Sequence, residues 1–239
     1  EALLLANRPD GELPLKGLAV LVTAGPTQEP LDPVRFLTNH STGKMGYALA
    51  EQARDLGAQV TLVSGPVALD APYGVDVVDV TTARDMFDAV TNRFADTDIT
   101  VMAAAVGDFR PVEQARDKIK KNGRSGIELE LTSNPDILAW AGEHKRPDQT
   151  LCGFAMETRD LETNAAKKLA SKHCDMLAAN NLRTPGAGFA ADTNVVTVLT
   201  PGETADRPNI ERWSKMGKDA LAKRILVKLA AMRADGERR

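Results

Sequence analysis

Short apolar runs alternate with amphipathic segments along most of this chain. The runs predict β-strands at residues 18–24, 58–63, 75–80, 98–106, 150–156, 175–179 and 195–200. Helix-like spacing of apolar residues predicts helices at 43–57, 82–95, 135–144, 160–173 and 214–233. The early runs, such as ITVMAAAV at 99–106, are apolar at almost every position, which is typical of parallel strands buried on both faces.

The alternation of strands and helices predicts an α/β fold with a mostly parallel, doubly wound sheet. Such sheets bind ligands beyond the carboxyl ends of their strands. The loops after Ala24, Val63, Val106 and Glu157 are therefore the candidate site.

Two segments depart from this pattern. Residues 127–132, IELELT, alternate between apolar and polar positions, and we expect a half-exposed strand that leaves the main sheet. Residues 201–212 are mostly polar, and we expect them to connect the last strand to the closing helix without regular structure.

Composition narrows the choice of partners. The chain has 239 residues, 43% hydrophobic and 26% charged, as in ordinary globular proteins. A net charge of −3 and a pI near 5.7 argue against nucleic-acid binding, and no apolar run reaches the roughly 20 residues of a membrane span. Cys152 and Cys174 form no CxxC pair, so we expect reduced thiols and a cytoplasmic protein.

The stretch GPTQEPLDPVRFLTNHSTGKMG, residues 25–46, occupies the place of a phosphate-binding loop but matches neither common phosphate motif. A Walker A loop would need Ser or Thr after Gly43-Lys44, where Met45 stands, and the dinucleotide fingerprint would follow the first strand directly. Gly43 and Gly46 nevertheless open a predicted helix, whose first N–H groups favour an anion. The alternative is that the glycines only allow tight packing. The polar residues that precede them favour the anion site: Arg35, Asn39, His40, Ser41 and Thr42.

A second candidate region follows the strand predicted at 98–106. Its three alanines leave room for a flat ligand, and Asp108 stands at the strand end, where it can bind a metal or a ligand hydroxyl. A basic segment then carries Lys118 and, on alternate faces of an extended chain, Lys120 and Lys121. The segment is either a solvated loop or a lysine-bearing lid over a polyphosphate, and its place beside the anion site favours the lid.

Two further segments could contact a nucleotide. In TSNPDILAW, Ser133 or Asn134 is expected to cap a helix with Pro135 at its first position. After GFAMET, Lys168 and Lys172 stand four residues apart on a predicted helix, where like charges repel and a bound anion would relieve the repulsion. Simple capping and solvated lysines are the alternatives.

These motifs together resemble one family. GPTQEPLDPVRFLTNHSTGKMG, AAAVGDFRP, DKIKK, NPDI and GFAMET, in this order, are similar to phosphopantothenate–cysteine ligase, also called phosphopantothenoylcysteine synthetase. The resemblance is closest to the bacterial kind, which is fused behind a flavin-dependent decarboxylase in coenzyme A biosynthesis. In that family CTP activates the carboxylate of 4′-phosphopantothenate as an acyl-cytidylate and releases pyrophosphate. The amine of L-cysteine then displaces CMP.

The resemblance also implies roles for residues of this chain. Asn39 matches the family asparagine needed to convert the acyl-cytidylate, and Lys118 matches the lid lysine of the first half-reaction. Arg35 matches a substrate-binding arginine, and Ala104 lines the acyl site. The implied nucleotide-binding residues are Gly25, Ser41, Gly43, Gly46, Met102, Ala103, Ala104, Asp108, Lys118, Pro135, Asp136, Ile137, Leu138, Phe154, Lys168 and Lys172.

The family's organisation supplies further expectations. It implies a Rossmann-like three-layer α/β/α sandwich, Mg²⁺ or Mn²⁺ bound with CTP, and a homodimer whose active sites draw on both chains. A higher assembly is expected where the ligase is fused to the decarboxylase. The basic segment and residues 127–132 are our candidate for the dimer arm.

The resemblance also sets expected domain limits. Residues 1–16 are expected to be a linker from a missing decarboxylase domain, and residues 17–239 the CTP-dependent ligase domain, without FMN or decarboxylase activity. Two alternatives remain, an NADP-dependent Rossmann-type oxidoreductase and a regulatory domain that senses a nucleotide.

Overall fold

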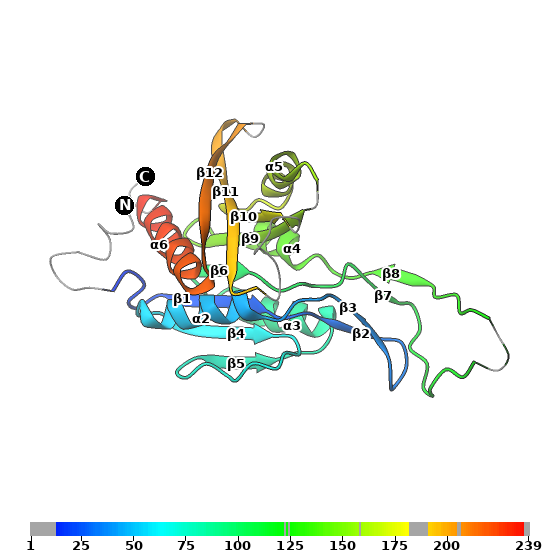
Figure 1. Cartoon of the computed structure of the whole chain (residues 1–239). Coiled ribbons are helices and arrows are strands. Elements are labelled where there is room, and N and C mark those ends of the chain that lie inside the picture. The colour runs from blue at the N-terminus through cyan, green and yellow to red at the C-terminus, as the bar shows by residue number, and fades with distance from the viewer. Residues whose placement is uncertain are drawn as a thin grey trace.

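A central sheet organises the molecule (Figure 1). The computed structural model describes residues 13–121, 123, 125–157, 159–181, 191–204 and 207–236. Within these residues the sheet has eight strands in the order β12-β11-β10-β9-β6-β1-β4-β5. Their bounds are β1 Ala19–Ala24, β4 Gln59–Ser64, β5 Asp76–Asp79, β6 Ile99–Met102, β9 Thr150–Glu157, β10 Met176–Asn181, β11 Thr193–Thr204 and β12 Arg207–Gly217.

The strands from β5 to β10 run parallel, whereas β11 and β12 extend the sheet as an antiparallel pair. At the centre, Val20 of β1 pairs in register with Val60 on one side and Ile99 on the other. Successive residues of β1 face opposite cores: Val20 belongs to one apolar cluster and Leu21 to the other, and both are buried. The prediction of a mostly parallel sheet covered on both faces is confirmed.

Helices form a layer on each face of the sheet, so the fold is the expected three-layer α/β/α sandwich. α2 (Lys44–Asp55) and α6 (Lys218–Gly236) cover one face, and α3 (Ala83–Phe94), α4 (Ile137–His144) and α5 (Leu161–Ser171) cover the other. The start of α3 is fixed by a capping box, in which Thr82 accepts from the amide of Asp85 while the Asp85 carboxylate accepts from the amide of Thr82.

Several predicted boundaries were wrong. The strand expected at 98–106 ends at Met102, and the three alanines belong to the loop beyond it. Residues 201–212 are not an irregular connection, because β11 and β12 pair through most of this range, and the closing helix therefore begins at Lys218 rather than at residue 214. The helix after TSNP is capped by Asp136, whose side chain accepts from the amide of Ala139.

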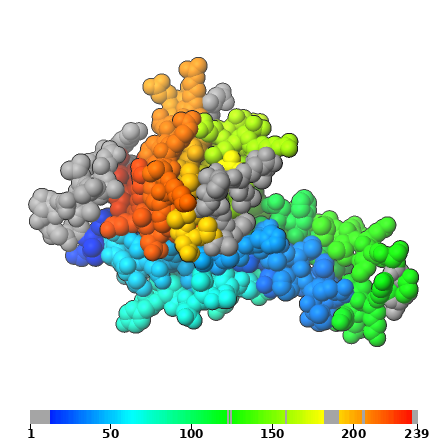
Figure 2. Space-filling view, viewed as in Figure 1, coloured from blue at the N-terminus to red at the C-terminus, as the bar shows by residue number. Residues whose placement is uncertain are grey.

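Two short hairpins project from one end of the sheet (Figures 1 and 2). β2 (Gln28–Pro30) pairs with β3 (Phe36–Thr38), and β7 (Phe109–Pro111) pairs with β8 (Leu131–Ser133). Of the strand expected at 127–132, only its last two residues pair in β8. Its apolar side chains are exposed on this single chain, namely Ile127, Leu129 and Leu131.

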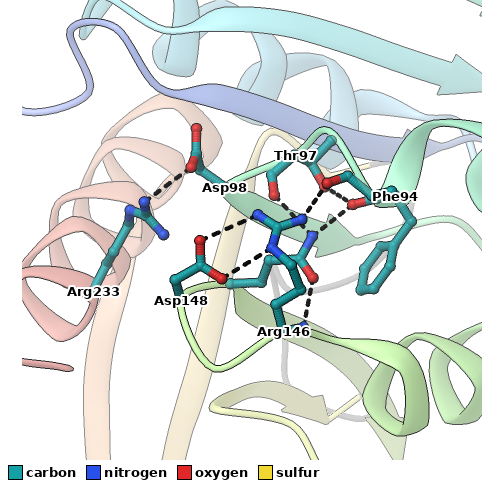
Figure 3. Close-up of polar contacts among 8 residues, drawn as sticks. Phe94, Thr97, Asp98, Arg146, Asp148 and Arg233 are labelled. Atoms are coloured by element: carbon teal, nitrogen blue, oxygen red, sulfur yellow. Dashed lines mark hydrogen bonds and ion pairs between the residues drawn. The ribbon is translucent and has the colours of Figure 1, made fainter. Parts of the chain in front are cut away.

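At the amino ends of the strands, charged side chains form ion pairs with one another (Figure 3). Arg233 of α6 pairs with Asp98 at 2.9 Å, and the other oxygen of Asp98 accepts from the main-chain amide of Ala19. Arg146 pairs with Asp148 at 3.0 Å in the turn before β9. The contacts of Asp98 tie α6 to the sheet, and the Arg146–Asp148 pair braces the turn, so we interpret this end as structural.

Two other features bear on the domain. The side chain of Leu15 is fully buried in the core, although it falls within the predicted linker; residues 1–12 lie outside the described residues, and the boundary at residue 16 stays a prediction. No helix in the described part of the chain is long and apolar enough to cross a membrane.

Candidate functional site

A cavity of about 420 Å³ opens beyond the carboxyl ends of the strands. β1 has β4 on one side and β6 on the other, so the sheet changes its direction of winding between β1 and β6, where α/β proteins commonly bind ligands. The segment between β1 and α2, the loop after β6 and the last residues of β9 supply most of the wall. The residues that line the cavity are Asn39, Ser41, Thr42, Gly43, Lys44, Met45, Gly46, Ala103, Ala104, Ala105, Val106, Asp108, Phe154, Ala155, Met156, Lys168, Asn180, Asn194 and Lys218.

A second cavity of about 330 Å³ adjoins the first on the α4 side of the sheet. The two share Ala104, Val106, Asp108, Phe154 and Lys168. The second also contains the predicted nucleotide-binding residues Met102, Pro135, Asp136, Ile137, Leu138 and Lys172. One continuous surface thus carries most of the residues predicted from the sequence.

Asn39 fixes the loop after β6. Its Nδ2 donates to the carbonyl oxygens of Ala105 at 3.0 Å and Val106 at 3.2 Å. From the other side, the Asn134 side chain donates to the carbonyl oxygen of Gly107 at 2.8 Å. The wall between the two cavities is therefore held by asparagines from both neighbouring loops.

Threonines hold the same loop from beneath. Thr23 in β1 accepts from the amide of Ala104 at 3.1 Å, and Thr27 accepts from the amide of Gly107 at 2.9 Å. These bonds satisfy amide groups that have no strand partner after β6 ends. The carbonyl and amide groups of this loop are consequently held in place before any ligand arrives.

Two glycines at the start of α2 allow other groups to approach the backbone closely. Gly43 has φ +78°, a conformation that other residues rarely adopt, and its amide donates to the Ser41 hydroxyl at 3.3 Å. Gly46 lies against β1, where an added Cβ would fall 2.4 Å from the Cβ of Ala24. Gly46 therefore permits tight packing, as the alternative interpretation proposed, and it also lines the cavity.

The lysines of α5 reach different partners. Lys168 donates to the carbonyl oxygen of Phe154 at 2.9 Å, and Lys172 pairs with Asp136 at 2.6 Å. Burial opposes ionisation of Asp136, but the bonds from Lys172 and Ala139 outweigh it and lower the pKa of the carboxyl. The start of α4 is thus tied to α5 across the second cavity.

Three predicted site residues line neither cavity in this chain. Gly25, with φ +76°, packs against Gly65 and Val67. Arg35 pairs with Asp32 at 2.5 Å beside the β2–β3 turn, and Lys118 is exposed on the basic segment. Their roles in binding stay predictions.

Four polar residues of the larger cavity were missed from the sequence as site residues: Lys44, Asn180, Asn194 and Lys218. The strand-end rule could have indicated Asn180, which stands near the end of β10. Lys218 has no comparable signal, because it opens a helix whose start was predicted four residues too early.

The described residues contain no group of three or more His, Cys, Asp and Glu side chains that could hold a metal. Asp108 is a carboxylate shared by both cavities. A single carboxylate is compatible with Mg²⁺, because Mg²⁺ usually keeps several waters and few protein ligands.

Residues 15–232 match the family described as the DNA/pantothenate metabolism flavoprotein C-terminal domain. The chain belongs to this family. It is 47% identical over 228 residues to the coenzyme A biosynthesis bifunctional protein CoaBC of Bacillus subtilis (strain 168), covering 94% of this chain and 54% of the relative. It is 45% identical over 184 residues to CoaBC of Escherichia coli (strain K12), covering 76% of this chain and 45% of the relative.

The solved structures agree with this membership. The crystal structure of the C-terminal domain of CoaBC superposes with a TM-score of 0.77 at 38% identity, covering 93% of this chain and 99% of that one. The chain spans about half the length of the curated relatives it matches. The resemblance to the ligase half of the bacterial fusion protein is confirmed, and these relatives give the NADP-dependent alternative no support.

Proposed function

We propose that this domain is a CTP-dependent phosphopantothenate–cysteine ligase. It joins 4′-phosphopantothenate to L-cysteine through an acyl-cytidylate and yields 4′-phosphopantothenoylcysteine, CMP and pyrophosphate. The observation that carries the proposal is the pair of adjoining cavities at the switch point, where most of the predicted nucleotide-binding residues meet Asn39. Family membership and the names of the relatives support the same pathway.

The two cavities suit the two parts of an acyl-cytidylate. The second cavity includes the start of α4, where Asp136 and Lys172 provide a carboxylate and an ammonium group for a base and ribose. The larger cavity has the glycine turn at the start of α2, whose amide groups and helix dipole favour phosphate oxygens. Lys168 lies between them, where the α-phosphate of CTP would join the acid.

In the first step a carboxylate oxygen of phosphopantothenate attacks the α-phosphorus of CTP, and the bond to the β-phosphate oxygen breaks. Pyrophosphate leaves with the electron pair. Both reactants are anionic, so Lys168, Lys118 and the Mg²⁺ (or Mn²⁺) carried by CTP would reduce their repulsion. Asp108 is the carboxylate we expect nearest the metal.

In the second step the amine of cysteine attacks the acyl carbon, and the bond to CMP breaks. The nitrogen loses a proton and CMP departs as the leaving group. We expect Asn39 to hold the acyl group beside the β6 loop. Its Nδ2 donates to two loop carbonyls in this chain, so one of these bonds would be exchanged for a bond to the tetrahedral oxyanion, which an amide can stabilise without proton transfer.

The domain is proposed to act as a homodimer in the cytoplasm. Arg35 and Lys118 lie outside the cavities of their own chain, and the exposed apolar residues of the β7–β8 arm suit burial against a second copy. A partner chain could therefore supply these two cations. Mixing inactive Lys118→Gln and Asn39→Asp proteins should restore part of the activity, because one site of each mixed dimer would then have both residues intact, whereas a fully active monomer in light scattering would contradict a shared site.

The decisive assay gives the domain CTP, Mg²⁺, phosphopantothenate and cysteine, and follows pyrophosphate and amide product. We expect both products in repeated turnovers when all reactants are present, and without cysteine no amide and at most one equivalent of pyrophosphate per site. A domain that binds CTP without releasing pyrophosphate would instead be a nucleotide sensor. Binding of NADPH without binding of CTP would contradict the proposal.

A further inference from the structure

The loop after β4 packs against the glycine turn that opens α2. Gly43 in this turn lines the larger cavity, whereas Val67 in the loop lines neither cavity. A Cβ added to Gly43 would fall 2.7 Å from Cγ1 of Val67, which is too close for a real side chain. Val67 therefore lies in direct contact with the turn, behind it as seen from the cavity.

The same side chain contacts a second glycine turn, the one that follows β1. A Cβ added to Gly25 would fall 3.0 Å from Cγ1 of Val67 and 2.8 Å from the carbonyl oxygen of Gly65. Gly25 directly follows β1 and Gly43 directly precedes α2. One valine thus packs against both ends of the long segment that joins β1 to α2.

Hydrogen bonds fix the loop to the same two elements. The amide of Gly65 donates to the carbonyl oxygen of Ala24 in β1 at 2.9 Å. The Ser64 hydroxyl donates to the carbonyl oxygen of Gly65 at 2.9 Å, so the Tyr47 hydroxyl of α2, 3.1 Å away, is the donor to Ser64. We call residues 64–67 the β4 brace, because they are bonded to β1 and α2 and packed between their ends.

The β4 brace occupies the place where other α/β proteins bind part of a ligand. β4 lies beside β1, on the side away from β6. In dinucleotide-binding folds the ribose lies beyond the strand next to the first one. In the described part of the chain, the residues that line the two cavities include none from β4 or the brace. The ligand contacts of this site are therefore confined to the β6 side of β1.

We propose, on the basis of the proposed function, that Val67 is a positioning residue for the phosphate-binding turn at Gly43. Its side chain fills the space behind the turn and holds the backbone amides toward the cavity before a ligand binds. Without this side chain the turn can move back into the vacated space, and binding must restore its position. A preorganised turn avoids that cost.

The test compares ligands that carry phosphate with the same molecules without it. Phosphate oxygens reach the turn either from CTP or from the phosphate monoester of phosphopantothenate, so each source has its own arm. We suggest calorimetric binding of CTP·Mg²⁺ and of phosphopantothenate to Val67→Ala, with cytidine and pantothenate measured by competition. Val67→Thr keeps the branched shape, and Leu69→Ala is the matched control, because Leu69 is also partly buried against the same core.

We expect Val67→Ala to weaken binding of at least one phosphate ligand about 10-fold, while cytidine and pantothenate change less than about 3-fold. The ligand that is weakened identifies the phosphate that the turn holds. Val67→Thr should restore the affinity to within about 3-fold of wild type. Leu69→Ala should bind all four ligands as wild type does, even where its melting temperature falls as far as that of Val67→Ala.

Three results would overturn the proposal: unchanged affinity of Val67→Ala for both phosphate ligands, an equal loss for their unphosphorylated forms, or the same loss in Leu69→Ala. Tyr47→Phe decides the matter if Val67→Ala fails to fold, because it removes only the hydroxyl that bonds to Ser64. We expect it to weaken the same phosphate-selective binding about 5-fold, and wild-type affinity would count against the brace.

This test is separable from the proposed function. If wild type releases no pyrophosphate from CTP, the ligase proposal fails, and the binding measurements still report on the phosphate turn. If wild type is active and Val67→Ala binds both phosphate ligands normally, only the role of Val67 fails.

Discussion

The guanidinium group of Arg35 donates a 2.8 Å hydrogen bond to the main-chain oxygen of Ile119, 84 residues further along the chain. Asp32 completes the contact, because its carboxylate accepts from the Ile119 amide at 3.0 Å and pairs with Arg35 at 2.5 Å. The basic segment is thus anchored to the β2–β3 turn immediately beside Lys118.

We predict that Asp32→Asn slows the first half-reaction about 10-fold, because the anchor loses its charge and holds Lys118 less firmly. Affinity for CTP alone should change little. Single-turnover release of pyrophosphate checks this, with Asp117→Asn, exposed on the same segment, as the control. Wild-type rates in the Asp32 variant would show that the anchor does not position the lysine.

The same carboxylate predicts a pH dependence. The Arg35 hydrogen bond holds the pKa of Asp32 far below its usual range, with help from the Ile119, Val34 and Arg35 amides. A depressed pKa stabilises the folded state fully at pH values above the unfolded pKa of about 3.9, and the stabilisation is lost progressively as pH falls from there through the much lower folded pKa. The difference in melting temperature between wild type and Asp32→Asn should therefore be full at pH 7 and shrink steadily as pH falls below about 4. A constant difference would contradict the ionic origin.

Lys118→Gln should impair acyl-cytidylate formation much more than CTP binding. The lost charge matters most as negative charge moves onto pyrophosphate, so we expect a decrease of about 10²-fold or more in the single-turnover rate. Lys121→Gln, which an extended segment places on the opposite face, should have a small effect. Equal effects of the two variants would indicate only a general contribution of charge.

Asn39→Asp separates the two half-reactions. The role proposed for Asn39 predicts a burst of pyrophosphate, accumulation of acyl-cytidylate and amide formation slowed about 10²–10³-fold. The structure also gives Asn39 a bracing role, since its Nδ2 holds the Ala105 and Val106 carbonyls, and an aspartate would repel both. Quench-flow with labelled CTP distinguishes the two, because bracing alone slows both half-reactions together.

Asn134→Asp is the comparison for bracing. Asn134 holds Gly107 in the same loop but is not expected to contact the acyl group. We expect it to slow both half-reactions alike, without a trapped intermediate. If Asn134→Asp also accumulates acyl-cytidylate, the assignment of Asn39 to the second step loses its basis.

The cysteines should be unreactive in the native protein. Burial raises the pKa of Cys152 well above its usual value and that of Cys174 to about 12, so hardly any thiolate forms at pH 8. Both thiols are free and buried. A thiol reagent should modify neither in the native state and both after unfolding in guanidinium chloride. Rapid native modification would indicate that the sheet opens locally.

The sequence determined the layers of this fold and the edge of the sheet at which the two cavities open. The continuous apolar runs of β1, β4 and β6 require cover on both faces, and the periodic segments supply that cover. The spacing of apolar residues predicted the helix that follows Gly43, and the φ of +78° at this residue explains why glycine stands there. These inferences succeed because burial and backbone sterics act on neighbouring residues.

The tertiary structure decided which segments that lie far apart in the sequence come into contact. β12 has a largely exposed, polar sequence, and it becomes a strand because β11 offers a partner for its backbone. Lys44 meets Lys218, and Arg35 meets Ile119, only because the sheet order and helix packing bring distant segments together. No local periodicity encodes such contacts, since long-range pairing depends on the packing of whole elements rather than on the preferences of single residues.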